Sequence, residues 1–148
     1  MAKALIVYAS RTGTTKRIAG VIAEGIRDAG VEVDLVDVKD VANESKLQGY
    51  DGYAFGSATY HGEMMQPMKT MLFLAEKAQV EGKIGGAFGA YGWSGEAPER
   101  IYDTMKNIFS MDMVGTSLKL KSPGLTPVVL KAAHDYGTEI ARRITAKG

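Results

Sequence analysis

The chain has 148 residues, a length at which about two-thirds of the unfolded surface can be buried in one domain. Its 18 basic and 17 acidic residues leave a formal net charge of +1, too small a surplus for a dedicated nucleic-acid-binding protein. It has no cysteine, which excludes disulfides, thiolate metal sites, iron–sulfur clusters and a cysteine nucleophile. No secretion signal and no run of about 20 apolar residues is visible. We therefore expect one domain over residues 1–148, located in the cytoplasm and without membrane contact.

Short apolar runs alternate with longer amphipathic segments along the chain. The apolar runs predict strands at residues 4–8, 31–36, 52–56, 84–89 and 117–120. Apolar residues at helical spacing predict helices at 14–29, 67–78, 96–109 and 126–146, with a short one between 40 and 50. This alternation is typical of βαβ units. The sequence thus predicts an α/β fold with a doubly wound, five-stranded parallel sheet and helices on both faces.

Glycine and methionine positions add three expectations about packing and helix capping. The predicted strand 84–89 is rich in Gly and Ala, which indicates that something packs closely against its backbone. Gly30 is placed where a helix C-terminal cap is expected. Met65, Met68 and Met71 fall along one helix face, which favours a role in filling the core.

The loop after the first predicted strand has the composition of an anion site. It contains hydroxyl groups and a glycine just before a helix, where free N–H groups and the helix dipole favour a phosphate. It lacks the Gly-Lys-Ser/Thr ending of a P-loop and the G-x-G-x-x-G dinucleotide pattern. The alternative is a helix start capped by Ser and Thr without a ligand. Its residues are Ser10, Arg11, Thr12, Gly13, Thr14 and Thr15.

Two further loops follow the third and fourth predicted strands and carry aromatic residues. Tyr60 lies in the first of them, and Trp93, the only tryptophan, lies in the second. In open parallel sheets, ligands bind beyond the carboxyl ends of the strands, where the strand order reverses. Two aromatic faces there can clamp a flat heterocycle, and each stacking pair adds about 0.5–1.5 kcal/mol. The alternative is a pair of aromatic loops that simply cover the end of the sheet.

The first loop fits the phosphate motif Ser/Thr-x-Thr-Gly-x-Thr of the flavodoxins, and the sequence resembles the short-chain members of that family. The likeness extends over residues 1–38, 56–60 and 89–95 and fades after about residue 110. The third loop is also similar to the flavodoxin domain of flavodiiron proteins. The interval between Phe109 and Thr126 is too short for the insertion of long-chain flavodoxins.

This resemblance implies a flavodoxin-like strand order of 2-1-3-4-5 and FMN as the cofactor, with no metal and no catalytic residue. In the first loop, the implied cofactor-binding residues are Ser10, Arg11, Thr12, Gly13, Thr14 and Thr15. In the second loop, they are Ser57, Ala58, Thr59, Tyr60, His61 and Gly62. In the third loop, they are Gly89, Ala90, Tyr91, Gly92, Trp93 and Gly95. Tyr60 and Trp93 would stack on the isoalloxazine.

The function that the resemblance implies is one-electron transfer between redox proteins. Such a protein is expected to be a monomer with transient protein partners and to bind neither nucleic acid nor membrane. The alternative is a small FMN enzyme of the quinone or protoporphyrinogen reductase type. A phosphate-binding receiver domain is disfavoured, because no acidic cluster follows the first strand and no Asp follows the third.

The charge of the chain departs from the family pattern. Flavodoxins are usually strongly acidic, whereas this chain has a pI of about 7.9. Arg11, Lys16 and Arg17 lie close to the phosphate loop. The electrostatic docking that is usual in the family is therefore not expected to carry over.

Many flavodoxins have Gly directly after the stacking aromatic, where a peptide flips when the flavin is reduced. Here His61 follows Tyr60, and Gly62 comes next. A side chain makes a flip to positive φ costlier by about 1 kcal/mol. We predict that His61→Gly stabilises the one-electron-reduced flavin, as measured by redox titration. If Gly62 is the flipping position instead, the substitution leaves the titration unchanged.

Overall fold

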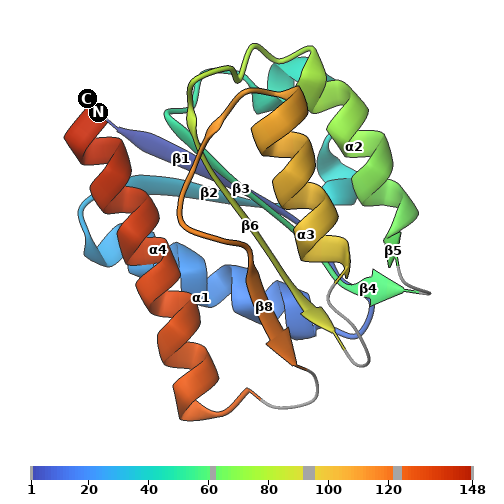
Figure 1. Ribbon diagram of the computed structural model, residues 1–148. Coiled ribbons are helices and arrows are strands. Elements are labelled where there is room, and N and C mark those ends of the chain that lie inside the picture. The colour runs from blue at the N-terminus through green and yellow to red at the C-terminus, as the bar shows by residue number, and fades with distance from the viewer. Residues whose placement is uncertain (1, 61–62, 92–95, 122–124, 148) are drawn as a thin grey trace.

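The computed structural model describes residues 2–60, 63–91, 96–121 and 125–147. Its main sheet is covered on one face by α1 and α4 and on the other by α2 and α3 (Figure 1). The helices are α1 (Thr14–Asp28), α2 (Gln66–Glu76), α3 (Glu96–Asp103) and α4 (Pro127–Lys147). The strands are β1 (Lys3–Ala9), β2 (Glu32–Asp37), β3 (Gly52–Ser57), β6 (Ile84–Tyr91), β7 (Asp112–Met113) and β8 (Leu118–Lys121).

The strand order confirms the predicted topology. The sheet runs β2-β1-β3-β6, and both β7 and β8 pair with β6, so these two short strands share the fifth position. All of these pairs are parallel. The order is therefore 2-1-3-4-5, with the reversal between β1 and β3, where a ligand crevice is expected.

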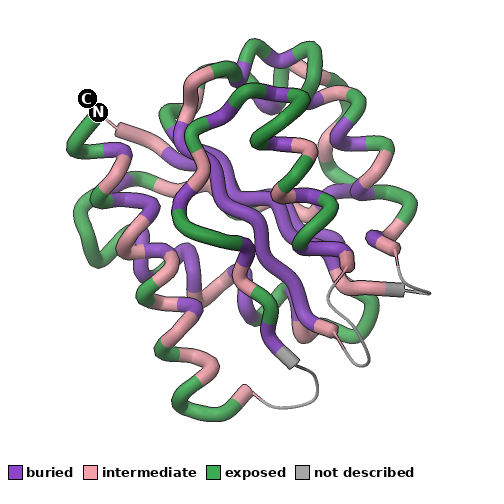
Figure 2. Tube along the Cα trace, viewed as in Figure 1, coloured by how far each residue is buried: buried purple, intermediate pink, exposed green. Residues whose placement is uncertain are grey.

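The central strand β1 is buried on both faces, as its continuous apolar run predicts. Leu5 and Val7 pack into the core beneath α2 and α3. Ala4 and Ile6 pack into the core beneath α1 and α4. The central strands stand out as the buried layer between the helices (Figure 2). Met68 and Met71 are buried in the first of these cores, which confirms the packing role predicted for them.

The fifth strand is interrupted, and Tyr136 fills the interruption. Between the pairs Gly85↔Met113 and Phe88↔Leu118, two residues of β6 lie opposite four residues of the edge strand. The Tyr136 hydroxyl accepts a hydrogen bond from the Ala87 N–H at 3.0 Å and lies 3.2 Å from the Ala87 carbonyl oxygen. Burial raises the pKa of this tyrosine. The Tyr136 side chain thus supplies the hydrogen-bond partner that the backbone of β6 lacks where the edge strand is interrupted.

Besides the split fifth strand, three segments differ from the sequence prediction. The segment between 40 and 50 forms two short 3-10 turns, Val38–Asp40 and Glu44–Leu47, instead of one helix. The side chains of Asp37 and Asn43 cap the two turns separately by accepting the N–H groups of Lys39 and Ser45. The helix expected to reach residue 109 continues beyond α3 as a π-helical turn, Thr104–Ile108.

The third difference lies after β3, where a loop was expected. The chain instead forms a short antiparallel pair, β4 (Thr59–Tyr60) with β5 (Glu63–Met64). None of the helices in the described ranges is long and apolar enough to cross a membrane.

Two glycines allow α1 and α4 to touch backbone to backbone. A Cβ atom on Gly25 would overlap the carbonyl oxygen of His134, and one on Gly137 would overlap that of Ile22. His134 also reaches the Asp28 carboxylate at 2.7 Å. Because these helices cover one whole face of the sheet, their close approach supports that core.

Gly25→Ala is therefore expected to destabilise the fold by about 1–3 kcal/mol, since the added methyl group must push the helices apart. Gly20→Ala on the same helix is the matched control, because a Cβ there would meet nothing within 4 Å apart from the adjoining backbone of its own helix. It should raise stability by up to about 1 kcal/mol through helix propensity. Urea unfolding of both variants measures the contrast. Equal effects would show that the helix contact is not tight.

Candidate functional site

The carboxyl ends of β1, β3 and β6 lie side by side, and a loop begins at each of them (Figure 1). The first two are joined where the Ala58 N–H donates to the Ala9 carbonyl at 3.1 Å. The second and third are in contact at Gly89, where a Cβ would overlap the carbonyl oxygen of Ser57. The lack of a side chain at Gly89 thus lets the two loops start next to each other.

The first loop is organised by backbone N–H groups at the start of α1. Gly13 precedes the helix with a φ of +92°, a left-handed conformation that suits glycine. The Ser10 hydroxyl accepts from the N–H groups of Gly13 at 3.0 Å and Lys16 at 3.3 Å. The Thr12 and Thr14 hydroxyls lie 3.5 Å apart beside it. The structure thus brings the predicted residues of this loop together.

Thr15 carries an unusual buried hydroxyl in this loop. The residue is 1% exposed, and its Oγ1 has no hydrogen-bond partner in the described part of the chain. Leaving a buried hydroxyl unpaired costs about 1–3 kcal/mol. Such a group at a helix N-terminus is suited to donate to an anion seated there.

The charges around the first loop favour the same kind of ligand. The first turn of α1 has no acidic residue, and Arg11, Lys16 and Arg17 are exposed. Cations at this end of a helix are disfavoured by the helix dipole unless an anion offsets them. Burial, followed by the charges of Asp37 and Asp40, raises the pKa of Tyr8 at the end of β1. The Tyr8 hydroxyl therefore adds no negative charge at neutral pH.

The second loop begins with side chains that hold the fold together. The Ser57 hydroxyl is buried, accepts from the Met65 N–H at 3.0 Å and donates to the Ala58 carbonyl at 2.9 Å. Ala58 and Thr59 are half-buried, and the backbone of Tyr60 lies in β4. His61 and Gly62, which were also predicted to bind the ligand, fall outside the described residues.

The third loop starts at the end of β6. Ala90 is buried and Tyr91 is half-buried. Gly92, Trp93 and Gly95 lie outside the described residues, so the aromatic clamp remains a prediction.

Contacts between the second and third loops were not predicted from the sequence. The Thr59 hydroxyl accepts a hydrogen bond from the Ala97 N–H of α3 at 3.2 Å. Glu63 forms ion pairs with Arg100 of α3 and Lys69 of α2, both at 3.4 Å. Thr59 and Ala97 are 38 positions apart in the sequence, and Glu63 and Arg100 are similarly distant. No local motif signals such a pairing.

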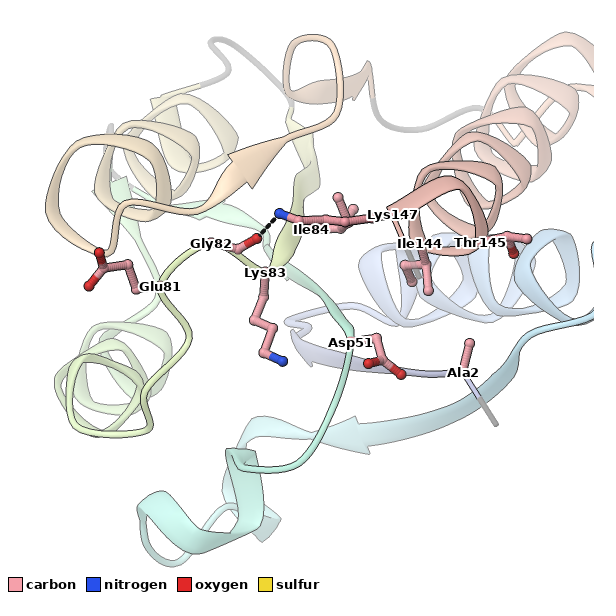
Figure 3. Close-up of a pocket in the computed structure, with 9 residues that line it drawn as sticks. All are labelled: Ala2, Asp51, Glu81, Gly82, Lys83, Ile84, Ile144, Thr145 and Lys147. Atoms are coloured by element: carbon pink, nitrogen blue, oxygen red, sulfur yellow. Dashed lines mark hydrogen bonds between the residues drawn. The ribbon is translucent and has the colours of Figure 1, made fainter.

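A cavity of about 740 Å³ opens at the opposite edge of the sheet (Figure 3). It lies at the amino ends of the strands, with Asp51 and Lys83 directed into it, and Lys147 binds the Gly82 carbonyl beside it. None of the described residues that line it is aromatic. Among the described residues, no group of three or more His, Asp or Glu side chains is arranged to hold a metal ion. The three loops are therefore the candidate site.

Comparisons with known proteins agree with the fold. A sequence profile of the family described as flavodoxin matches residues 6–133. A solved flavodoxin from the domain Archaea is 33% identical with a TM-score of 0.91, and the match covers 97% of this chain and 99% of that one. The flavodiiron protein of Giardia intestinalis is 26% identical with a TM-score of 0.90, and the match covers 97% of this chain and 36% of that one.

Among curated proteins, a diflavin flavoprotein A of a Nostoc species is 32% identical over 145 residues. That match covers 94% of this chain but 25% of the longer protein. The chain thus spans about a quarter of that relative's length.

Thr15→Val should separate ligand binding from folding. The substitution removes the unpaired hydroxyl at nearly constant volume, so the stability of the unliganded protein should stay equal or rise. Affinity for inorganic phosphate should fall about tenfold, because a hydrogen bond to a charged group is lost. Isothermal titration and urea unfolding measure the two effects. Thr138→Val, which removes a helical hydroxyl that binds the His134 carbonyl, is the control and should leave phosphate binding unchanged.

Proposed function

Because the chain belongs to the flavodoxin family, we propose that it carries electrons one at a time between redox proteins on a bound FMN. The family and its structural neighbours are FMN-binding electron-transfer flavoproteins. The observation that best supports the proposal is the buried, unpaired Thr15 hydroxyl inside a cradle of N–H groups and hydroxyls. This arrangement fits the terminal phosphate of FMN.

The first loop would hold that phosphate through hydrogen bonds. Ser10, Thr12, Thr14 and Thr15 supply hydroxyls, and Gly13 leaves the backbone open to a close approach. Arg11 adds a positive charge nearby. Hydrogen bonds to a charged acceptor are about twice as strong as those between neutral groups. The phosphate end would therefore supply much of the binding free energy.

The second and third loops would hold the ring. Tyr60 and Trp93 would stack on its two faces, and the glycines Gly62, Gly92 and Gly95 would let backbone groups approach its edge. The remaining implied positions in these loops are Ser57, Ala58, Thr59, His61, Gly89, Ala90 and Tyr91. Of these, the Ser57 hydroxyl is already used within the fold, so its contribution would come from the backbone.

When bound, FMN supplies reversible one-electron chemistry, and the protein tunes it by stacking, hydrogen bonding and exclusion of water. This role needs no side chain to act as an acid, a base or a nucleophile. The chain's own residues would orient the ring so that one edge stays open to a partner. An exposed edge is enough for electron transfer during a short encounter.

The charges at the rim bear on the choice of partner. Lys16 and Arg17 are exposed beside the phosphate loop and make no ion pair within the described ranges. Opposite charges on two docking faces speed their encounter. We therefore expect redox partners with an acidic docking face, in contrast to the usual partners of acidic flavodoxins.

The proposal predicts two separate one-electron steps when the FMN-loaded protein is reduced in a potentiometric titration. Absorption spectra recorded during stepwise reduction follow both steps. The separation reflects a protein that stabilises the intermediate oxidation state, as a one-electron carrier requires. Rapid oxidation of NADH or NADPH in the presence of a quinone, without a protein partner, would instead indicate an enzyme. Failure of the unliganded protein to take up FMN would contradict both functions.

A further inference from the structure

We propose that Thr59 is a positioning residue whose hydroxyl locks the second loop to the first turn of α3, so that both ring-binding loops act as one body. The inference rests on the proposed FMN function. It assigns Thr59 a task different from touching the flavin, namely setting the spacing between the two loops.

The hairpin that carries Tyr60 is anchored on two sides at its base. The Ala58 N–H binds the Ala9 carbonyl, which ties the start of the hairpin to β1. The Ser57 hydroxyl accepts from the Met65 N–H, which ties its end to the start of α2. These contacts fix the hairpin to the sheet, but neither connects it to the loop after β6.

The hydrogen bond of Thr59 supplies that connection. The Thr59 hydroxyl oxygen accepts a hydrogen bond from the N–H of Ala97, the second residue of α3. N–H groups in the first turn of a helix have no partner inside the helix, and a capping side chain normally accepts the one at this position. Here the capping oxygen comes from a segment 38 residues earlier. The start of α3 is therefore held by the second loop.

The ion pair between Glu63 and Arg100 links the same two elements but is the weaker tie. The Glu63 side chain is 33% exposed and the Arg100 side chain is 55% exposed. Ion pairs in such solvated positions contribute little to stability. Thr59 is half-buried and Ala97 is fully buried, so water competes less well for their hydrogen bond. The hydrogen bond is thus expected to set the geometry.

The two ends of the cofactor would therefore depend on different parts of the protein. The phosphate loop is built on β1 and α1 and does not involve Thr59. Loss of the Thr59 hydroxyl should loosen the ring slot and leave the phosphate cradle intact. Binding of a phosphate-free flavin reports on the ring slot, and binding of inorganic phosphate reports on the cradle.

The test compares Thr59→Val, which removes the acceptor at similar volume, with Thr59→Ser, which keeps it. Unliganded wild type and both variants are titrated with FMN, riboflavin and inorganic phosphate. Thr59→Val should bind FMN and riboflavin about fivefold more weakly, as expected for one hydrogen bond, with phosphate affinity unchanged. Thr59→Ser should restore both flavin affinities. Thr15→Val should show the opposite pattern, with FMN and phosphate weakened and riboflavin unaffected.

Two further measurements separate positioning from general destabilisation. Hydrogen exchange of the Ala97 amide in the unliganded protein should accelerate in Thr59→Val and return to the wild-type rate in Thr59→Ser. The midpoint potentials of the bound flavin should shift in the valine variant and recover in the serine variant.

Equal riboflavin affinity in wild type and Thr59→Val would overturn the inference, and so would an unchanged exchange rate at Ala97. A parallel loss of phosphate affinity in Thr59→Val would also overturn it, since it would indicate damage to the whole fold. If wild type itself binds no FMN, the proposed function fails as well. If the wild type binds FMN normally and Thr59→Val has no effect, the inference about Thr59 fails while the proposed function stands.

Discussion

The unpaired hydroxyl of Thr15 is the constraint around which the candidate site is built. A folded chain rarely buries a donor without an acceptor, because the desolvation of that group is not recovered. Thr15 is held in this state by the first turn of α1, where Gly13 has a left-handed conformation. The Ser10 hydroxyl accepts hydrogen bonds from the N–H groups of Gly13 and Lys16 beside it. The unliganded protein thus carries a local cost that a bound anion would remove. Relief of that cost would appear as tighter binding of the anion, and the ligand would stabilise the folded protein in proportion to that affinity.

The two ends of the site depend on different kinds of structure. The phosphate cradle is local, since its residues are consecutive and belong to one strand–helix connection. The proposed ring slot would be assembled from segments far apart in the chain, which are linked by contacts such as Thr59 with Ala97 and Glu63 with Arg100. A local site is formed as soon as its helix forms, whereas an assembled slot needs the whole sheet to be in place. The affinity of the first is therefore less sensitive to changes elsewhere in the fold.

This difference also explains what could be predicted from the sequence. Apolar periodicity predicted the strands and the helices, because burial on two faces leaves a continuous pattern in β1 and an amphipathic pattern in α1. The phosphate loop was recognisable because its residues are adjacent. The split of the fifth strand was not, because Tyr136, which fills it, approaches from α4. The hairpin after β3 was not recognisable either, because it pairs two strands of only two residues each. A two-residue strand has no periodicity of its own.

The glycines of β6 show how one compositional signal can have several physical causes. Their number predicted close packing against the backbone, and each described contact confirms it with a different neighbour. Gly85 faces the sulfur of Met113, Gly86 faces the Tyr136 hydroxyl, and Gly89 faces the backbone of Ser57. The first two positions make room for the protein's own side chains and secure the interrupted edge of the sheet. Gly89 alone lies at the rim, where the missing side chain lets the second and third loops start in contact. The same composition thus serves packing at one end of the strand and the geometry of the ring slot at the other.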